Sequence, residues 1–293
     1  MNSSQCPVCF GARLKEWGTK NGYPIYQCTE CTHVFAGEVK LASNIEDEAE
    51  FRRHITNGAA DDDQAQYEQL CRGEREGGLV FLTTRMILDD LQRQQCENKE
   101  WLDIGCGSGY LLANLQRRGV KPTGIEPGGW GQIAAREKKV QVVHGLLELG
   151  TFSKKFDYVS ATDVLEHQSD PYVLMKLIRH YLADTGRAYL SFPLADTFRP
   201  WLMRARWAMV IPPTHCSFFT RKSFARLAAK VGFRIEKFAQ YNSTGFRGWG
   251  RLGLRLAAAN KIGDALRIGD QGLVAISPLA PRCDVKLPAA ADD

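Results

Sequence analysis

The chain has 293 residues, of which 44% are hydrophobic and 24% are charged, as in an ordinary globular protein with a sizeable core. Its net charge of +5 permits an acidic ligand but does not require a nucleic acid. It contains no apolar run of roughly 18 residues, so no membrane-spanning helix is expected. The N-terminal MNSSQCPVCF does not read as a signal peptide. We therefore expect a cytoplasmic protein.

Residues 1–37 are expected to form a small zinc-ribbon module. Cys6 and Cys9 form one close pair of cysteines, and Cys28 and Cys31 form another. Such pairs in a cytosolic chain indicate a metal site, because four thiolates complete the tetrahedral shell of zinc. His33 follows closely, but four sulfurs already fill that shell. The zinc would be structural, and it would supply the folding energy that so short a module lacks.

Residues 38–95 are expected to form a linker followed by N-terminal helices. The stretch 38–75 is polar and acidic. The stretch 78–94 has apolar residues at helical spacing, and these are Val80, Met86, Ile87 and Leu91.

From residue 96 to residue 282 strand and helix patterns alternate. Strands are expected at 101–104, 140–143 and 186–193 and within 121–127 and 156–167, and helices at 109–119, 131–139 and 170–183. This order predicts a doubly wound α/β domain with a parallel sheet and a ligand site at the carboxyl ends of its strands. A helix at 221–232 and strands at 233–241 and 272–279 are expected to complete it.

Three further segments interrupt or follow this rhythm. Residues 196–219 are aromatic and basic, and we expect them to form a lid over the site or a helical pair that packs on the sheet. Residues 245–268 are expected to form a basic helical insert. Residues 283–293 are expected to be a disordered tail.

The turn LDIGCGSG, residues 102–109, indicates a nucleotide site. The dinucleotide fingerprint is G-x-G-x-x-G, but here the third glycine comes one residue early. A phosphate-binding loop would need a lysine that this turn lacks. Neither phosphate pattern therefore fits.

The turn resembles the first motif of the class I S-adenosylmethionine-dependent methyltransferases. The resemblance extends over about residues 101–279 and implies a Rossmann-like, seven-stranded fold. It implies that the cofactor lies against the turn residues Asp103, Gly105, Cys106, Gly107 and Gly109. It also implies an adenine site at Leu146 and Leu147, and it places Asp163 at the methionine end.

Glu126 ends the second strand, 23 residues after Asp103. A carboxylate at this position can accept hydrogen bonds from both ribose hydroxyls. Taken singly, Glu126 fits a solvated loop acid and Asp163 fits a helix cap. Because both occur in this order and each lies at the end of a strand, we favour the interpretation that they contact the cofactor.

Two histidines are candidate catalytic bases, since a hydroxyl acceptor benefits from a base near neutral pKa. His167 ends DVLEH, and His215 lies in PPTHCSFFT. These motifs resemble the subgroup that contains the ubiquinone-biosynthesis O-methyltransferases and small-molecule or sugar methyltransferases. The resemblance implies that both histidines line the pocket, and either one fits the role of base. Some members hold a divalent cation at the positions of Glu166 and His167, but a further upstream glutamate is missing here.

The sequence thus favours O-methylation of a small-molecule, sugar or lipid-linked acceptor in a biosynthetic pathway. The alternative is an RNA base methyltransferase that uses the zinc module for RNA contact, although that module carries only Arg13, Lys15 and Lys20 as cations. A non-catalytic scaffold is disfavoured by the intact glycine turn. A dimer is left open.

The 245–268 insert places Arg247, Arg251 and Arg255 on one helical face. This face fits peripheral contact with an anionic membrane, a grip on a phosphorylated acceptor, or simple packing on the core.

Overall fold

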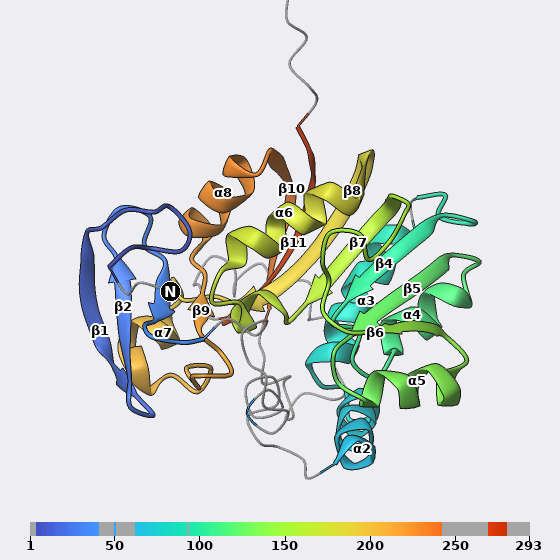
Figure 1. Cartoon of the computed structure of the whole chain (residues 1–293), viewed down its shortest axis with the longest axis horizontal. Coiled ribbons are helices and arrows are strands. Elements are labelled where there is room, and N and C mark those ends of the chain that lie inside the picture. The colour runs from blue at the N-terminus through green and yellow to red at the C-terminus, as the bar shows by residue number, and fades with distance from the viewer. Residues whose placement is uncertain (1–3, 41–49, 51–61, 93, 242–268, 280–293) are drawn as a thin grey trace, which may run out of the picture.

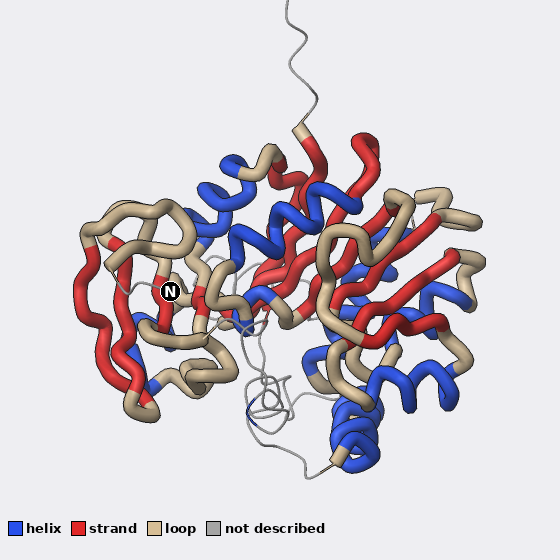
Figure 2. Tube along the Cα trace, viewed as in Figure 1, coloured by secondary structure: helices blue, strands red, loops and turns tan. Residues whose placement is uncertain are grey.

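A computed structural model of the chain describes residues 4–40, 50, 62–92, 94–241 and 269–279. The basic insert with Arg247, Arg251 and Arg255 and the tail 283–293 lie outside these residues. Two sheets organise the described part of the chain, and they lie side by side in Figures 1 and 2.

The large sheet has seven strands in the order β10-β11-β8-β7-β4-β5-β6. Their bounds are β4 Glu100–Ile104, β5 Lys121–Glu126, β6 Gln141–His144, β7 Phe156–Thr162, β8 Leu182–Pro193, β10 Phe233–Tyr241 and β11 Gln271–Pro278. The pairs among β4 to β8 are parallel, whereas β11 pairs antiparallel with both β8 and β10. The predicted doubly wound α/β fold with seven strands is thus confirmed, and β11 is the strand that runs against the others. After the crossover from β8 to β10, β11 enters the gap between them in the opposite direction.

The helices of the structure are α2 Asp63–Arg75, α3 Leu79–Leu91, α4 Tyr110–Gln116, α5 Trp130–Lys138, α6 Pro171–Tyr181, α7 Phe198–Met203 and α8 Arg221–Lys230. Two short 3-10 helices, η2 Leu165–His167 and η3 Arg204–Arg206, lie in the connections. None of the helices within the described ranges is long and apolar enough to cross a bilayer.

Successive residues of β4 fill two separate cores. The Trp101 ring stacks on Tyr158 and Tyr189 in a cluster with side chains of α3 and α4. Leu102 and Ile104 belong to the other cluster, which includes side chains of α6 and α8. Side chains that alternate along a strand point to opposite faces, so the sheet is covered by helices on both faces.

The N-terminal segment and the insert after β8 share the small sheet. Its order is β1-β2-β3-β9, with β1 Leu14–Lys20, β2 Tyr23–Cys28, β3 Val34–Ala36 and β9 Ser217–Phe218. Val34 pairs with Phe218 and Phe35 pairs with Ser217. His33 Nε2 also lies 3.1 Å from Ser217 Oγ. The segment predicted at 196–219 thus contributes a strand to the sheet of the segment predicted at 1–37.

A close approach of β1 to η3 fixes the outer part of this arrangement. Gly18 has φ +145°, and a Cβ there would lie 2.7 Å from Ala205 Cβ. Gly22, in the β1–β2 turn, has φ +81° but open space around its Cβ position. Both positions disfavour a side chain, but only Gly18 also lacks the room for one.

We predict that Gly18→Ala lowers the free energy of unfolding by about 3 kcal/mol, because it adds overpacking to backbone strain. The matched change Gly22→Ala should cost about 1 kcal/mol, since only the strain applies. Urea denaturation of both variants measures the difference. Equal losses would contradict a tight contact between β1 and η3.

Candidate functional site

The glycine turn connects β4 to α4 at the carboxyl edge of the large sheet. Gly105, Gly107 and Gly109 have φ values of +66°, +53° and +70°. These values lie in the left-handed region that glycine adopts without steric cost. A Cβ at Gly105 would also lie 2.7 Å from a methyl group of Val164. The turn therefore depends on glycine, and its backbone is not covered by side chains of its own.

Glu126, at the end of β5, holds this turn in place. Its Oε2 accepts a hydrogen bond of 2.9 Å from the Gly107 N–H, and its Oε1 accepts one of 3.0 Å from the Gly128 N–H. Burial raises the pKa of Glu126 to about 7, although the two N–H donors oppose the shift. Each carboxylate oxygen keeps a second lone pair. The predicted contact with ribose hydroxyls is thus compatible with these bonds.

Asp103 lies in β4 and is oriented by a chain of two hydrogen bonds. Trp101 Nε1 donates to Ser160 Oγ at 2.7 Å, and Ser160 Oγ donates to Asp103 Oδ1 at 2.6 Å. Burial raises the pKa of Asp103 to about 7, and the nearby charge of Glu126 adds to the shift. Ser160 was not among the predicted site residues. The signal was present, since it is a hydroxyl residue inside the apolar strand β7.

Cys106 and the two leucines occupy different positions around the turn. The Cys106 side chain is buried and packs with Leu112, away from the open side of the turn. Only its backbone is therefore suited to contact a cofactor. Leu147 belongs to the main core, whereas Leu146 is half-buried in the loop after β6.

Asp163 follows β7 in a strained conformation. Its φ is +56°, which is uncommon for a residue with a side chain. Ser191 Oγ donates to Asp163 Oδ1 at 3.0 Å, and the Asp163 N–H donates to the Ser191 carbonyl at 3.1 Å. Burial raises the pKa of Asp163 to about 6. The strain is retained because β8 holds the residue through both contacts.

The structure brings His167 and His215 together, although they lie 48 positions apart in the chain. Their ring centroids are 4.8 Å apart with planes at 88°. The Cys216 N–H donates to the Glu166 carbonyl at 2.8 Å, which fixes the insert beside η2. Glu166, His167 and His215 each offer a ligand atom within 4.8 Å of the others, so this set has the spacing of a cation site.

Glu166 is buried in the structure, with 2% of its surface exposed, and nothing in the sequence indicated this. Its Oε2 has no hydrogen-bond partner among the described residues. Burial, together with the charge of Asp163, raises its pKa well above the usual range. A buried acceptor without a donor is costly unless a ligand supplies one.

His215 is arranged to accept a proton. Its Nδ1 lies 3.0 Å from the Met209 carbonyl oxygen. Because a carbonyl can only accept, Nδ1 carries the hydrogen and Nε2 keeps its lone pair. Burial lowers the pKa of His215 to about 4, so the ring is neutral at pH 7.

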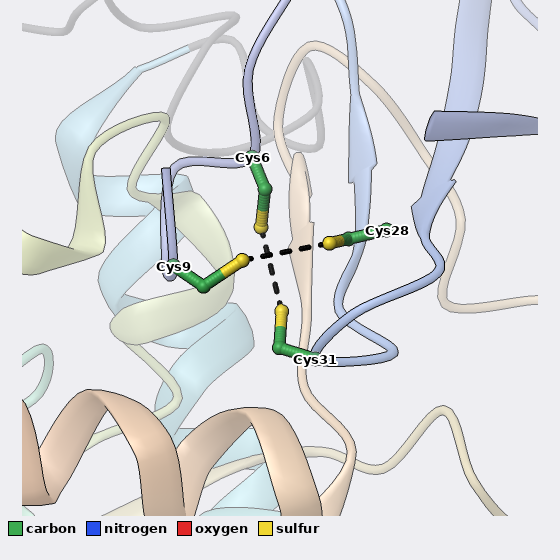
Figure 3. A group of neighbouring side chains, drawn as sticks. All are labelled: Cys6, Cys9, Cys28 and Cys31. Carbon is green, nitrogen blue, oxygen red and sulfur yellow. Dashed lines mark hydrogen bonds between the residues drawn. The ribbon is translucent and has the colours of Figure 1, made fainter. Parts of the chain in front are cut away.

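The four paired cysteines converge at one point, as Figure 3 shows. Cys6 Sγ lies 3.5 Å from Cys31 Sγ, and Cys9 Sγ lies 3.5 Å from Cys28 Sγ. All four sulfurs lie within 4.8 Å of one another, and none forms a disulfide. Tetrahedral zinc with bonds of about 2.3 Å needs sulfurs about 3.8 Å apart. The cluster therefore fits that ion. His33 is not part of it and contacts Phe35 and Phe219 instead.

A family model described as a methyltransferase domain matches residues 77–237 of this chain. A ubiquinone biosynthesis O-methyltransferase of Aeromonas salmonicida is 28% identical over 153 residues, which are 47% of this chain and 64% of that protein. The corresponding protein of Pseudomonas aeruginosa is 30% identical over 108 residues, 34% of this chain and 47% of its own length. The chain thus spans less than two thirds of these curated relatives.

Solved structures show the same fold at low identity. An S-adenosylmethionine-dependent methyltransferase of Mesorhizobium loti superposes with a TM-score of 0.51 at 15% identity, covering 66% of this chain and 97% of that chain. One from Clostridium acetobutylicum has a TM-score of 0.51 at 8% identity, covering 73% of this chain and 99% of that chain. The large sheet and its helices therefore form a Rossmann-like methyltransferase fold.

The raised pKa of Glu126 leads to a pH prediction for the ligand-free protein. A carboxyl with a folded pKa of about 7 adds stability that is present below about pH 4.5 and is lost as the pH rises through 7. Relative to Glu126→Gln, the wild type should therefore lose up to roughly 3 kcal/mol between pH 5 and pH 8. Urea unfolding at both pH values measures this.

The exposed Glu148 provides the control for this measurement. The stability of Glu148→Gln relative to the wild type should change little over the same range. A constant difference between the wild type and Glu126→Gln would show that Glu126 is already ionised in the folded protein at pH 5.

Proposed function

This chain belongs to the methyltransferase domain family, and we propose that it transfers the methyl group of S-adenosylmethionine to a hydroxyl of a small-molecule, sugar or lipid-linked acceptor. The observation that carries the proposal is the contact between His167 and His215 at the carboxyl edge of the sheet. The Nδ1 of His215 faces the Met209 carbonyl, which leaves its Nε2 free to accept a proton. The printed activity of the curated relatives, O-methylation in ubiquinone biosynthesis, supports the choice of oxygen as the acceptor atom.

The residues around the glycine turn fit S-adenosylmethionine. The backbone is left-handed at Gly105, Gly107 and Gly109, and at Gly107 the nearest atom to a Cβ would be a methyl group of Leu70 at 3.8 Å. Glu126 offers lone pairs for ribose hydroxyls. We assign the adenine to the loop with Leu146 and Leu147. Asp103, a buried acid in β4, and Asp163, a half-buried acid after β7, would hold the methionine part. When bound, the cofactor supplies an electrophilic methyl carbon on a sulfonium.

His215 is our candidate for the general base. Its Nε2 takes the proton of the acceptor hydroxyl while the hydroxyl oxygen attacks the methyl carbon. The low pKa of His215 keeps this nitrogen unprotonated down to about pH 5. His167, at right angles to it, positions the acceptor. The buried Oε2 of Glu166 gains a donor when a hydroxyl or a cation enters.

We also propose that Cys6, Cys9, Cys28 and Cys31 bind one structural zinc ion. The sulfur spacing supports this assignment, and a shell of four thiolates leaves no position for catalysis. The zinc would stabilise β1 to β3, on which β9 and hence His215 depend.

We predict that His215→Ala lowers the rate of S-adenosylhomocysteine release in the presence of acceptor by 100-fold or more, since general-base catalysis contributes about 10²–10⁴-fold. His167→Ala should lower it less and raise the KM for the acceptor. A panel of catechols, sugars and lipid-linked sugars serves as acceptors. Calorimetry should give one S-adenosylhomocysteine site per chain in every variant.

The exposed His180 is the matched control, and His180→Ala should keep full turnover. Full turnover in both His215→Ala and His167→Ala would refute base catalysis by histidine. A chain that fails to bind S-adenosylhomocysteine would refute the cofactor assignment. Methylation of RNA but of no small acceptor would refute the acceptor class.

Zinc analysis tests the cysteine cluster. The purified chain should contain one zinc ion, and Cys28→Ser should lose it because three thiolates hold zinc less tightly. The loss should also lower the thermal midpoint by several degrees. Cys71→Ser, a half-buried cysteine outside the cluster, should keep the ion. A full zinc content in Cys28→Ser would overturn the assignment.

A further inference from the structure

A groove lies apart from the glycine turn and the histidine pair. It has a volume of about 620 Å³ and is formed by the small sheet, α7 and the start of α8. This volume is in the range of small-molecule sites. The residues that define its chemistry are Lys15, Trp17, Phe198, Trp201, Arg204 and Lys222.

The groove is positively charged. Lys15, Arg204 and Lys222 line it from three different elements, and all three are exposed. None of them has an ion-pair partner within the described ranges, whereas the nearby Arg13 pairs with Glu30 and Arg221 pairs with Asp196. The acid in the lining is Asp196, whose Oδ2 is bound by Arg221 at 3.0 Å. The remaining charge suits a phosphate group.

The same groove presents aromatic rings. Trp201 is 70% exposed and Phe198 is 59% exposed, with ring centroids 6.0 Å apart. Trp17 of β1 also lines the groove and is almost fully buried. Large aromatic side chains on the rim of a charged groove provide stacking surfaces for a flat ring, as in nucleic-acid base recognition.

One buried acceptor in the lining lacks a donor. Asp196 Oδ1 is inaccessible to solvent and has no hydrogen-bond partner among the residues that the structure describes. The hydroxyls of Thr32 and Thr220, 2.6 Å apart, also line the groove. A ligand N–H or O–H group in the groove would satisfy Asp196 Oδ1 once the carboxylate turns toward the groove.

From these three features we propose that the groove binds a nucleotide. Its phosphates contact Lys15, Arg204 and Lys222, its base stacks on Trp201, and a base N–H or ribose O–H donates to Asp196. The groove shares no residue with the glycine turn or the histidine pair. This inference therefore goes beyond the proposed function and does not depend on which acceptor is methylated.

Calorimetry with uridine diphosphate on the full chain tests the proposal. We expect saturable binding of one molecule per chain, both with and without saturating S-adenosylhomocysteine. Lys222→Glu and Trp201→Ala should each weaken the binding at least tenfold. The controls Lys121→Glu and Val173→Ala, which change an exposed cation and an exposed apolar residue elsewhere, should leave it within twofold.

S-adenosylhomocysteine binding and the thermal midpoint should be unchanged in all four variants, which shows that they fold. Displacement of uridine diphosphate by S-adenosylhomocysteine, or equal weakening in the controls, would overturn the proposal. Pyrophosphate that binds as tightly as uridine diphosphate would overturn the role of the ring. The absence of nucleotide binding, with binding to phosphatidylglycerol vesicles that is lost in Trp201→Ala, would assign the surface to a membrane instead.

Discussion

The pairing of β3 with β9 is the constraint on which the candidate site depends. Two backbone pairs, Val34 with Phe218 and Phe35 with Ser217, attach the insert after β8 to the sheet that the cysteine cluster holds. His215 lies directly before β9, and the Cys216 N–H fixes it against η2. The position of the candidate base relative to the glycine turn is thus set by a segment near the N-terminus. The cysteine cluster thus supports the edge that carries His167 and His215 from outside the large sheet.

The same edge of the large sheet carries four acidic side chains with raised pKa values. Asp103, Glu126, Asp163 and Glu166 lie at the carboxyl ends of the central strands, and burial raises the pKa of each. Three of them are held by hydroxyls or backbone N–H groups, whereas Glu166 keeps an oxygen without a donor. Keeping such groups buried costs stability in the ligand-free protein. A cationic sulfonium and a hydroxyl donor are ligands that would offset this cost.

The insert after β8 links the candidate active site to the charged groove. Its first part, α7, presents Phe198 and Trp201 to the groove, and its last part carries His215. Trp207 and Val210 between them pack on Ile25 and Val34 of the small sheet. Because this middle section is buried against the small sheet, the insert is held in place along its length. Its two ends therefore reach the histidine pair and the groove from one rigid support.

The sequence by itself determined the strand and helix order, the glycine turn and the cysteine pairs, because each depends on residues close together in the chain. Local spacing set the left-handed turn at Gly105 and the four-sulfur cluster. It did not reveal the reversed direction of β11, the pairing of β9 with β3, or the contact of Ser160 with Asp103. These were decided by tertiary structure, since each joins segments whose partners are chosen by packing and not by local pattern. The same holds for the groove, because its cations and rings come from four elements, β1, α7, η3 and α8, that only the folded chain brings together.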